Sequence, residues 1–146
     1  GHPHDFELLT ALTAYYDGPI ATGENLFSMS ETYNLMRYGG LRADRDFIQV
    51  DPALSYGVVE FANIVRLGEA GDWPRSQMVP HAGHQLAFHT VAGLQLGAHE
   101  IAARPDFVLG GLQAGVEVQG GFATLPETPG LGFETHKQLW AVLGEL

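Results

Sequence analysis

Four short apolar segments alternate with four segments of helical periodicity between residues 5 and 101. Each apolar segment leads into an ionisable residue, and these residues are Glu24, Asp51, His81 and Glu100. The helical segments are 5–16, 28–40, 55–67 and 85–96. Short strands that alternate with helices of about 10–13 residues are typical of parallel strands joined by crossover helices. The pattern therefore predicts an α/β fold built from successive β/α units.

The number of predicted strands limits the choice of architecture. In a β/α barrel the functional side chains lie at the carboxyl ends of the strands, but a whole barrel has eight strands and typically about 250 residues. We therefore interpret residues 1–104 as the C-terminal half of such a barrel and 105–146 as a C-terminal extension. The extension has β segments near 116–118 and 122–124 and a helix near 136–145. The alternative is a complete small four-stranded α/β sheet, which the length permits.

Charge and composition exclude several classes of function. The 146 residues contain 7 Lys plus Arg and 17 Asp plus Glu, for a net charge of -10. Nucleic acids and anionic membranes require clustered cations, so neither is expected as a partner. The chain has no cysteine, which excludes disulfides and thiolate metal sites. Because no apolar run is long enough to cross a bilayer and no signal peptide is visible, we expect a cytoplasmic protein that acts on a small molecule.

Asp51 and His81 are the strongest candidates for acid–base chemistry. Ends of neighbouring parallel strands lie about 4.8 Å apart, so these two side chains could form a hydrogen bond. A carboxylate bound to one ring nitrogen fixes the tautomer of an imidazole and makes it a general acid or base. Taken singly, Asp51 could serve only an Asp-Pro turn and His81 could be a buried histidine bonded to backbone.

Three further residues complete the predicted site. Glu24, in a turn beside Gly23, suits a hard cation such as Mg²⁺, although it could instead stabilise the following helix. Glu100 is expected to face the substrate, as a donor if protonated and as an acceptor if not; it could also be an exposed loop acid. His84 is placed with Glu100 as a substrate-binding residue, and the alternative is a helix cap. The several histidines also raise a weaker hypothesis of zinc binding.

Four stretches of the sequence carry a family resemblance. They are 21–28 (ATGENLFS), 37–61 (RYGGLRADRDFIQVDPALSYGVVEF), 79–85 (VPHAGHQ) and 129–134 (PGLGFE). Together they resemble the mandelate racemase subgroup of the enolase superfamily. Within that subgroup they are most similar to the acid-sugar dehydratases, which include D-tartrate dehydratase.

The resemblance implies a (β/α)₇β barrel with a capping domain built from both chain ends, which the extension 105–146 would join. Glu24 would match the third of three Mg²⁺ carboxylates, and Asp51 with His81 the dyad on the sixth and seventh strands. Glu100 would match the eighth-strand acid beside the substrate carboxylate. Mg²⁺ would stabilise the enediolate formed when the α-proton leaves, and His81 would protonate the departing hydroxyl, which makes the enzyme a lyase acting on a sugar acid.

The family pattern also extends beyond this sequence. Its other two metal carboxylates and its lysine base belong to strands that would precede Gly1, and the chain holds one lysine, Lys137. We therefore expect a C-terminal portion that is inactive alone, with a homo-oligomer expected by analogy. Two alternatives stay open, namely a non-catalytic fragment or assembly module and a racemase or epimerase of the same superfamily.

Overall fold

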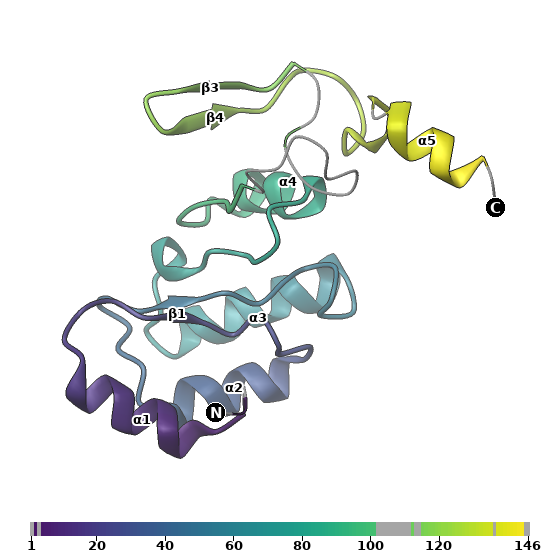
Figure 1. Ribbon diagram of the computed structural model, residues 1–146. Coiled ribbons are helices and arrows are strands. Elements are labelled where there is room, and N and C mark those ends of the chain that lie inside the picture. The colour runs from purple at the N-terminus through teal and green to yellow at the C-terminus, as the bar shows by residue number, and fades with distance from the viewer. Residues whose placement is uncertain (1, 3, 102–111, 113–114, 136, 145–146) are drawn as a thin grey trace.

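The computed structural model describes residues 2, 4–101, 112, 115–135 and 137–144. Figure 1 shows a layered part built on short strands, from which a hairpin and a terminal helix extend. The layered part has two parallel strands and four α-helices, and the helices α1 and α2 lie along one side of the strands. The bounds in this part are α1 (Phe6–Tyr15), β1 (Ala21–Thr22), α2 (Met29–Tyr38), β2 (Phe47–Ile48), α3 (Val58–Ala70), the 3₁₀ turn η1 (Arg75–Gln77) and α4 (Gln85–Leu94).

The strands run parallel in chain order, as the alternation predicts. Ala21 is opposite Phe47, and Thr22 is opposite Ile48. Ile48 also forms a parallel bridge with Met78, so the third predicted strand is reduced to a single bridge after η1. The segment before Glu100 lies beside it, where the Gly97 amide donates to the Met78 carbonyl oxygen at 3.1 Å, although residues 98–101 form no strand.

Local sequence signals fix where the helices begin. The Asp5 side chain accepts from the Leu8 amide at 3.0 Å and caps α1. Ser28 caps α2 in a complete capping box with Glu31, which satisfies donors that the first turn leaves free. Helix α3 begins later than the periodicity predicts because the residues before it, Tyr56 and Gly57, have φ values of 59° and 93°.

A core of apolar side chains, with an ion pair at its edge, stabilises the layered part. The ion pair joins Arg42 and Asp46 at 2.9 Å, and the Asp46 side chain is 0% exposed. Burial opposes ionisation of Asp46, but the hydrogen bonds from the Arg42 side chain and from the backbone amides of Ile20 and Arg42 together outweigh it, so the pKa of this carboxyl is lowered. The cluster of buried apolar side chains is Leu26, Leu35, Ile48, Val50, Phe61, Ile64, Val65, Trp73 and Met78.

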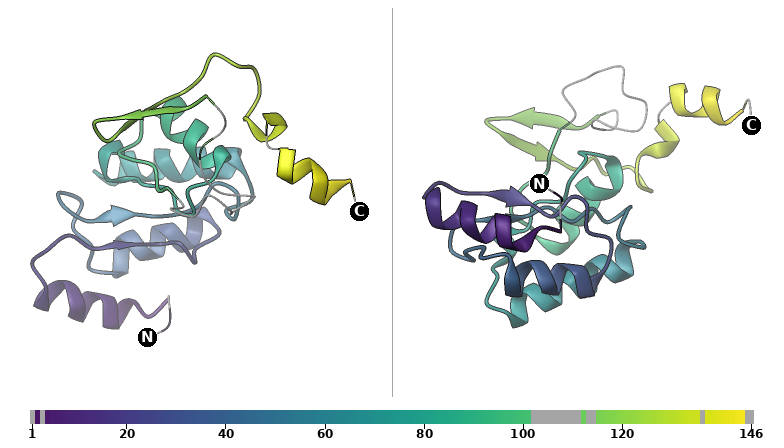
Figure 2. Two further views of the ribbon diagram at one scale, coloured as in Figure 1. Left: turned by 45° about the horizontal axis from the view of Figure 1, so that its top comes forward. Right: turned by 60° about the horizontal axis from the view of Figure 1, so that its bottom comes forward.

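The C-terminal part has the predicted β segments and helix. Strands β3 (Glu117–Gln119) and β4 (Phe122–Thr124) form an antiparallel hairpin, followed by η2 (Phe133–Thr135) and α5 (Lys137–Leu143). Figure 2 shows α5 extending away from the layered part in both views. The predicted boundary at 104/105 lies outside the described residues, and a role for 105–146 in a capping domain stays a prediction. Among the described residues, none of the helices has the length and apolarity that a membrane crossing requires.

Candidate active site

The predicted site residues gather where the strands end. Glu24 follows β1 after Gly23, whose φ is 120° and where an added Cβ would lie 3.2 Å from the backbone nitrogen of Gln49. A side chain at position 23 would therefore be strained and crowded against the backbone just after β2. The Glu24 side chain is 49% exposed, and its Oε1 accepts from Asn25 Nδ2 at 3.4 Å. Glycine thus lets the chain turn tightly so that a solvated carboxylate lies at the strand end.

Asp51 pairs with His84. The Asp51 side chain is 2% exposed, and its oxygens lie 3.0 and 3.1 Å from His84 Nε2. Backbone amides of Ala53 and Leu54 also donate to Asp51 Oδ1. Burial opposes ionisation of Asp51, but the hydrogen bonds from His84 and from these amides outweigh it, so the pKa of Asp51 is lowered. Asp51 is therefore a buried, charged acceptor.

Both ring nitrogens of His84 have partners. Its Nδ1 accepts from the Ala87 amide at 3.1 Å and caps the N-terminus of α4. Because an acceptor nitrogen carries no proton, the proton of the neutral ring is on Nε2 and is donated to Asp51. The alternative considered for His84, a helix cap, is thus realised, whereas its predicted role in substrate binding stays a prediction. In this arrangement it has no free nitrogen to offer a substrate.

The expected hydrogen bond between Asp51 and His81 is not formed. The chain turns sharply between the two histidines, where Ala82 and Gly83 have φ values of 78° and 59°. This turn, together with the capping of α4, directs the His84 ring toward Asp51. The pairing of Asp51 with His81 was therefore wrong, because the sequence does not reveal a left-handed turn that brings His84, and not His81, to the aspartate.

His81 lies instead beside two other carboxylates. Its Nδ1 is 3.1 Å from Glu100 Oε2 and 3.5 Å from Glu24 Oε2, and its side chain is 35% exposed. These are ion-pair distances, although neither contact has the angles of a hydrogen bond. No hydrogen bond or ion pair among the described residues engages His81 Nε2. The structure therefore brings Glu24, His81 and Glu100 into one cluster.

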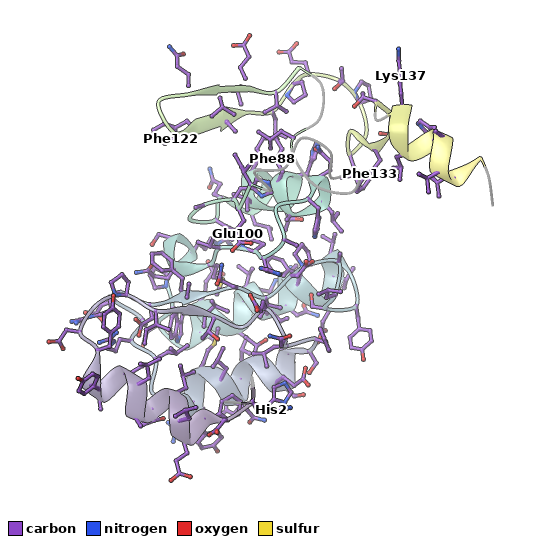
Figure 3. All side chains as sticks on the ribbon, in the orientation of Figure 1. His2, Phe88, Glu100, Phe122, Phe133 and Lys137 are labelled. Atoms are coloured by element: carbon purple, nitrogen blue, oxygen red, sulfur yellow. The ribbon has the colours of Figure 1, made fainter. Side chains whose placement is uncertain are left out.

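Glu100 is held by a residue that the sequence analysis did not single out. Gln49 Nε2 donates to Glu100 Oε1 through a short hydrogen bond, and the Ala82 amide donates to Oε2 at 2.8 Å. Figure 3 shows Glu100 in the middle of the molecule, far from Phe122 and Lys137 in the C-terminal part. Alternation of side chains along β2 is the only sequence signal that could have placed Gln49 on the same side as the strand-end acids.

The described residues offer few ligands for a metal ion. Among the described residues, no group of three or more His, Asp or Glu side chains is arranged to hold a metal ion. Glu24 offers one exposed carboxylate, the kind of oxygen ligand that Mg²⁺ prefers. These residues therefore do not form a complete magnesium site by themselves, and the zinc hypothesis gains no support from them.

His99 lies near the site in an apolar environment. Neither of its ring nitrogens has a hydrogen-bond partner, and its ring lies 5.1 Å from that of Phe88. Burial, and then the charge of His84, lower the pKa of His99 to about 4, against a smaller raising effect of Glu100. His99 is therefore neutral near pH 7 and is a structural residue rather than part of the cluster.

Comparison with known proteins identifies the family. The family model described as "Enolase C-terminal domain-like" matches residues 2–139. The chain belongs to the enolase superfamily. Solved structures with similar folds, described next, place it in the mandelate racemase subgroup, and its barrel is the C-terminal half of the superfamily barrel.

Three structures illustrate the enolase-superfamily relationship. A mandelate racemase/muconate lactonizing enzyme from Polaromonas sp. JS666 is 27% identical with a TM-score of 0.73, covering 96% of this chain and 36% of that one. The L-talarate dehydratase of the same organism, complexed with Mg and L-glucarate, is 26% identical with a TM-score of 0.68, covering 96% and 37%. An enzyme of the first type from a marine actinobacterium, in complex with magnesium, shares the fold at 21% identity and a TM-score of 0.73, covering 97% and 38%. The chain thus spans little more than a third of each relative.

Proposed function

We propose that this chain is the C-terminal portion of a Mg²⁺-dependent acid-sugar dehydratase, a lyase. The observation that carries the proposal is the placement of His81, whose Nδ1 faces the carboxylates of Glu100 and Glu24 at the strand ends. The similarity to a structure described as an L-talarate dehydratase complexed with Mg and L-glucarate supports a sugar acid as the substrate class. The sequence resemblance to D-tartrate dehydratase suggests a four-carbon diacid as the first substrate to test.

His81 acts as the general acid in this proposal. A carboxylate that faces Nδ1 keeps a proton on that nitrogen, and Nε2 is then the nitrogen that exchanges a proton with the substrate. In a dehydration, the proton on Nε2 passes to the β-hydroxyl as its C–O bond breaks, and water leaves. Asp51 and His84 stabilise the turn that carries His81, and Glu100 lines the substrate.

Glu24 is proposed as one ligand of the magnesium ion. When bound, Mg²⁺ would supply Lewis-acid stabilisation of the negative charge on a substrate carboxylate. The remaining ligands and the base that removes the α-proton would come from outside the described residues. Lys137, the only lysine, lies on α5 far from Glu100 in Figure 3. The chain alone is therefore expected to be inactive.

Two measurements test the proposal. The intact mass of the natural protein decides which molecule to assay, because a mass well above 15.8 kDa identifies a longer chain. Mg²⁺-dependent loss of water is then measured for four- to six-carbon sugar acids. His81→Ala should reduce kcat by about 10²–10⁴-fold, the usual contribution of a general acid. His4→Ala, a change at an exposed histidine, is the matched control and should leave turnover unchanged. Full turnover in His81→Ala would contradict the role assigned to His81.

A racemase or epimerase is the second candidate, because the same histidine could move a proton without loss of water. Deuterium from D₂O incorporated at the α-carbon of recovered substrate, with inversion and no dehydrated product, would favour it.

The non-catalytic alternative rests on a different observation. Beside β1, in a groove of about 320 Å³, the leucines Leu8, Leu9 and Leu12 of α1 lie along the strand, which pairs only with β2 within the described part of the chain. Such a face favours association. A homo-oligomer that shows no turnover with any sugar acid, in the complete natural protein, would favour an assembly role.

A further inference from the structure

A cavity between helices α2 and α3 lies apart from the site described above. Its volume is about 400 Å³, and it is lined by Tyr33, Met36 and Arg37 of α2, Leu67 and Ala70 of α3, and Trp73. These residues belong to the C-terminal parts of the two helices and to the segment after α3. Glu24 and Asp51 follow strands, whereas this cavity lies where the chain is about to enter the next strand. It is therefore at the opposite end of the layered part.

Trp73 brings an unused hydrogen-bond donor to this cavity. The residue is only 4% exposed, and its Cδ1 atom, next to the indole nitrogen, lies 3.9 Å from the place that a Cβ on Gly71 would take. Gly71 is exposed and also lines the cavity. No hydrogen bond among the described residues uses the Trp73 N–H, yet its nitrogen is not among the buried side-chain atoms that lack a partner. A buried tryptophan usually finds an acceptor, and here the N–H opens onto the cavity instead.

Arg37 brings a second, charged donor. It is exposed in the last turn of α2, where its charge offsets the partial negative charge of the helix end. Its guanidinium makes no hydrogen bond or ion pair with any described residue, whereas Arg42, Arg45 and Arg75 are all in ion pairs. A free guanidinium can bind a carboxylate through two parallel hydrogen bonds. A neutral and a cationic donor thus line one cavity, and both suit a ligand that accepts hydrogen bonds.

We infer that this cavity binds a small amphipathic carboxylate, an apolar or aromatic body that carries one carboxylate group. The carboxylate would accept from Arg37 and from the Trp73 N–H, and the body would lie against Met36, Leu67 and the ring of Tyr33. The volume is within the range usual for small-molecule sites. A sugar acid suits the cavity poorly, because its hydroxyl groups would lose water against apolar walls. The ligand therefore differs in class from the proposed substrate, and the inference does not depend on the proposed function.

The test follows the two indole N–H signals of the full chain by ¹H–¹⁵N NMR near neutral pH, with 3-phenylpropionate as the probe. A Trp140→Phe sample assigns the signals. The Trp73 signal should move downfield and saturate with a dissociation constant of about 1 mM or below. The Trp140 signal should stay in place, because that indole lies on α5 and donates to the Glu134 carbonyl oxygen. The uncharged analogue 3-phenylpropanamide should bind the wild type at least about tenfold more weakly, since it lacks the charge that Arg37 recognises.

A variant tests the role of Arg37 directly. Arg37→Met keeps an apolar side chain of similar length and should weaken binding of 3-phenylpropionate at least about tenfold. Arg45→Met, which removes an arginine that does not line the cavity, is the matched control and should leave the affinity unchanged. A Trp73 signal that ignores the probe, equal binding of acid and amide, or equal losses in the two variants would overturn the inference. So would a Trp73 signal that moves with protein concentration and not with the probe, because a second copy would then cover the cavity.

Discussion

The layered part, residues 5–101, and the C-terminal part, residues 115–144, differ in how their apolar side chains are buried. Every buried apolar side chain among the described residues lies in the layered part, between Leu26 and Phe88. In the C-terminal part, Phe122 is 80% exposed, and Val118 and Trp140 are 55% and 53% exposed. Burial of apolar area is the main favourable term in folding, so the layered part has its own core. The described residues of the C-terminal part have regular secondary structure but form no core of their own.

This difference predicts the largest effect of a single substitution. Ile64, which is 1% exposed in the core cluster, should lose about 2–5 kcal/mol of unfolding free energy on replacement by alanine. Val142→Ala in α5, where the side chain is 53% exposed, should change it by less than about 0.5 kcal/mol. Urea denaturation of both variants provides the comparison. Similar losses in the two would show that α5 packs against something in solution, which would remove the distinction between the parts.

Sequence alone predicted most elements because their signals are local. The periodicity and the caps at Asp5 and Ser28 predicted α1 and α2 nearly to the residue. The third strand was overestimated, since Met78 makes one bridge and the chain before it turns as η1. Pairing between strands depends on tertiary contacts that short apolar runs do not encode.

The site was predicted in its membership but not in its pairings. Glu24, His81 and Glu100 do meet, and Asp51 and His84 do meet, yet the expected pair of Asp51 with His81 does not form. The alternation of strands and helices indicates which side chains lie at the carboxyl ends of the strands. The partner of an imidazole, however, depends on backbone angles such as the φ of 78° at Ala82. The functions of these residues stay predictions.

Asp51 is a buried polar residue that also stabilises the layered part. Replacing Asp51 with alanine removes a buried, charged acceptor and leaves the Nε2–H of His84 without its partner, and such a loss typically costs about 1–3 kcal/mol. Because the pKa of Asp51 is lowered, its stabilising contribution is complete above the unfolded pKa of a carboxyl and is lost as pH falls through the lower folded pKa. The difference in unfolding free energy between wild type and Asp51→Ala should therefore narrow in acid. Glu24→Gln, at an exposed carboxylate, is the control with little expected change.

His99 lies where the two parts meet. A cavity of about 400 Å³ is lined by His99 and Phe88 from the layered part and by Val118 and Phe122 from the hairpin. The pKa of His99 is lowered to about 4 by burial and by His84, so the unfolded chain takes up a proton at higher pH than the folded chain does. Stability should then be full above about pH 6.5 and decline as pH falls toward 4.

The size of this pH effect can be checked by substitution. Solvent that reaches part of the His99 side chain reduces the expected effect to roughly 1–2 kcal/mol. His99→Phe should remove that share of the acid-induced loss of stability, measured by thermal melts between pH 7 and 4, whereas His4→Phe should not. An unchanged pH dependence in His99→Phe would mean that the histidine is hydrated in solution and that the hairpin does not enclose it.

The smallest expected change in unfolding free energy is that of the helix cap at Ser28, which lies in the layered part and is encoded by neighbouring residues. Ser28 caps α2, and the Glu31 side chain accepts hydrogen bonds from the amides of Phe27 and Ser28 at 2.7 and 3.0 Å. Loss of a serine cap costs about 1 kcal/mol, so Ser28→Ala should lower the unfolding free energy by about that amount. Asn34→Ala, at an exposed position of the same helix, is the control and should not lower the unfolding free energy. If the loss in Ser28→Ala exceeds that in Ile64→Ala, helix capping and not core burial distinguishes the layered part from the hairpin and α5.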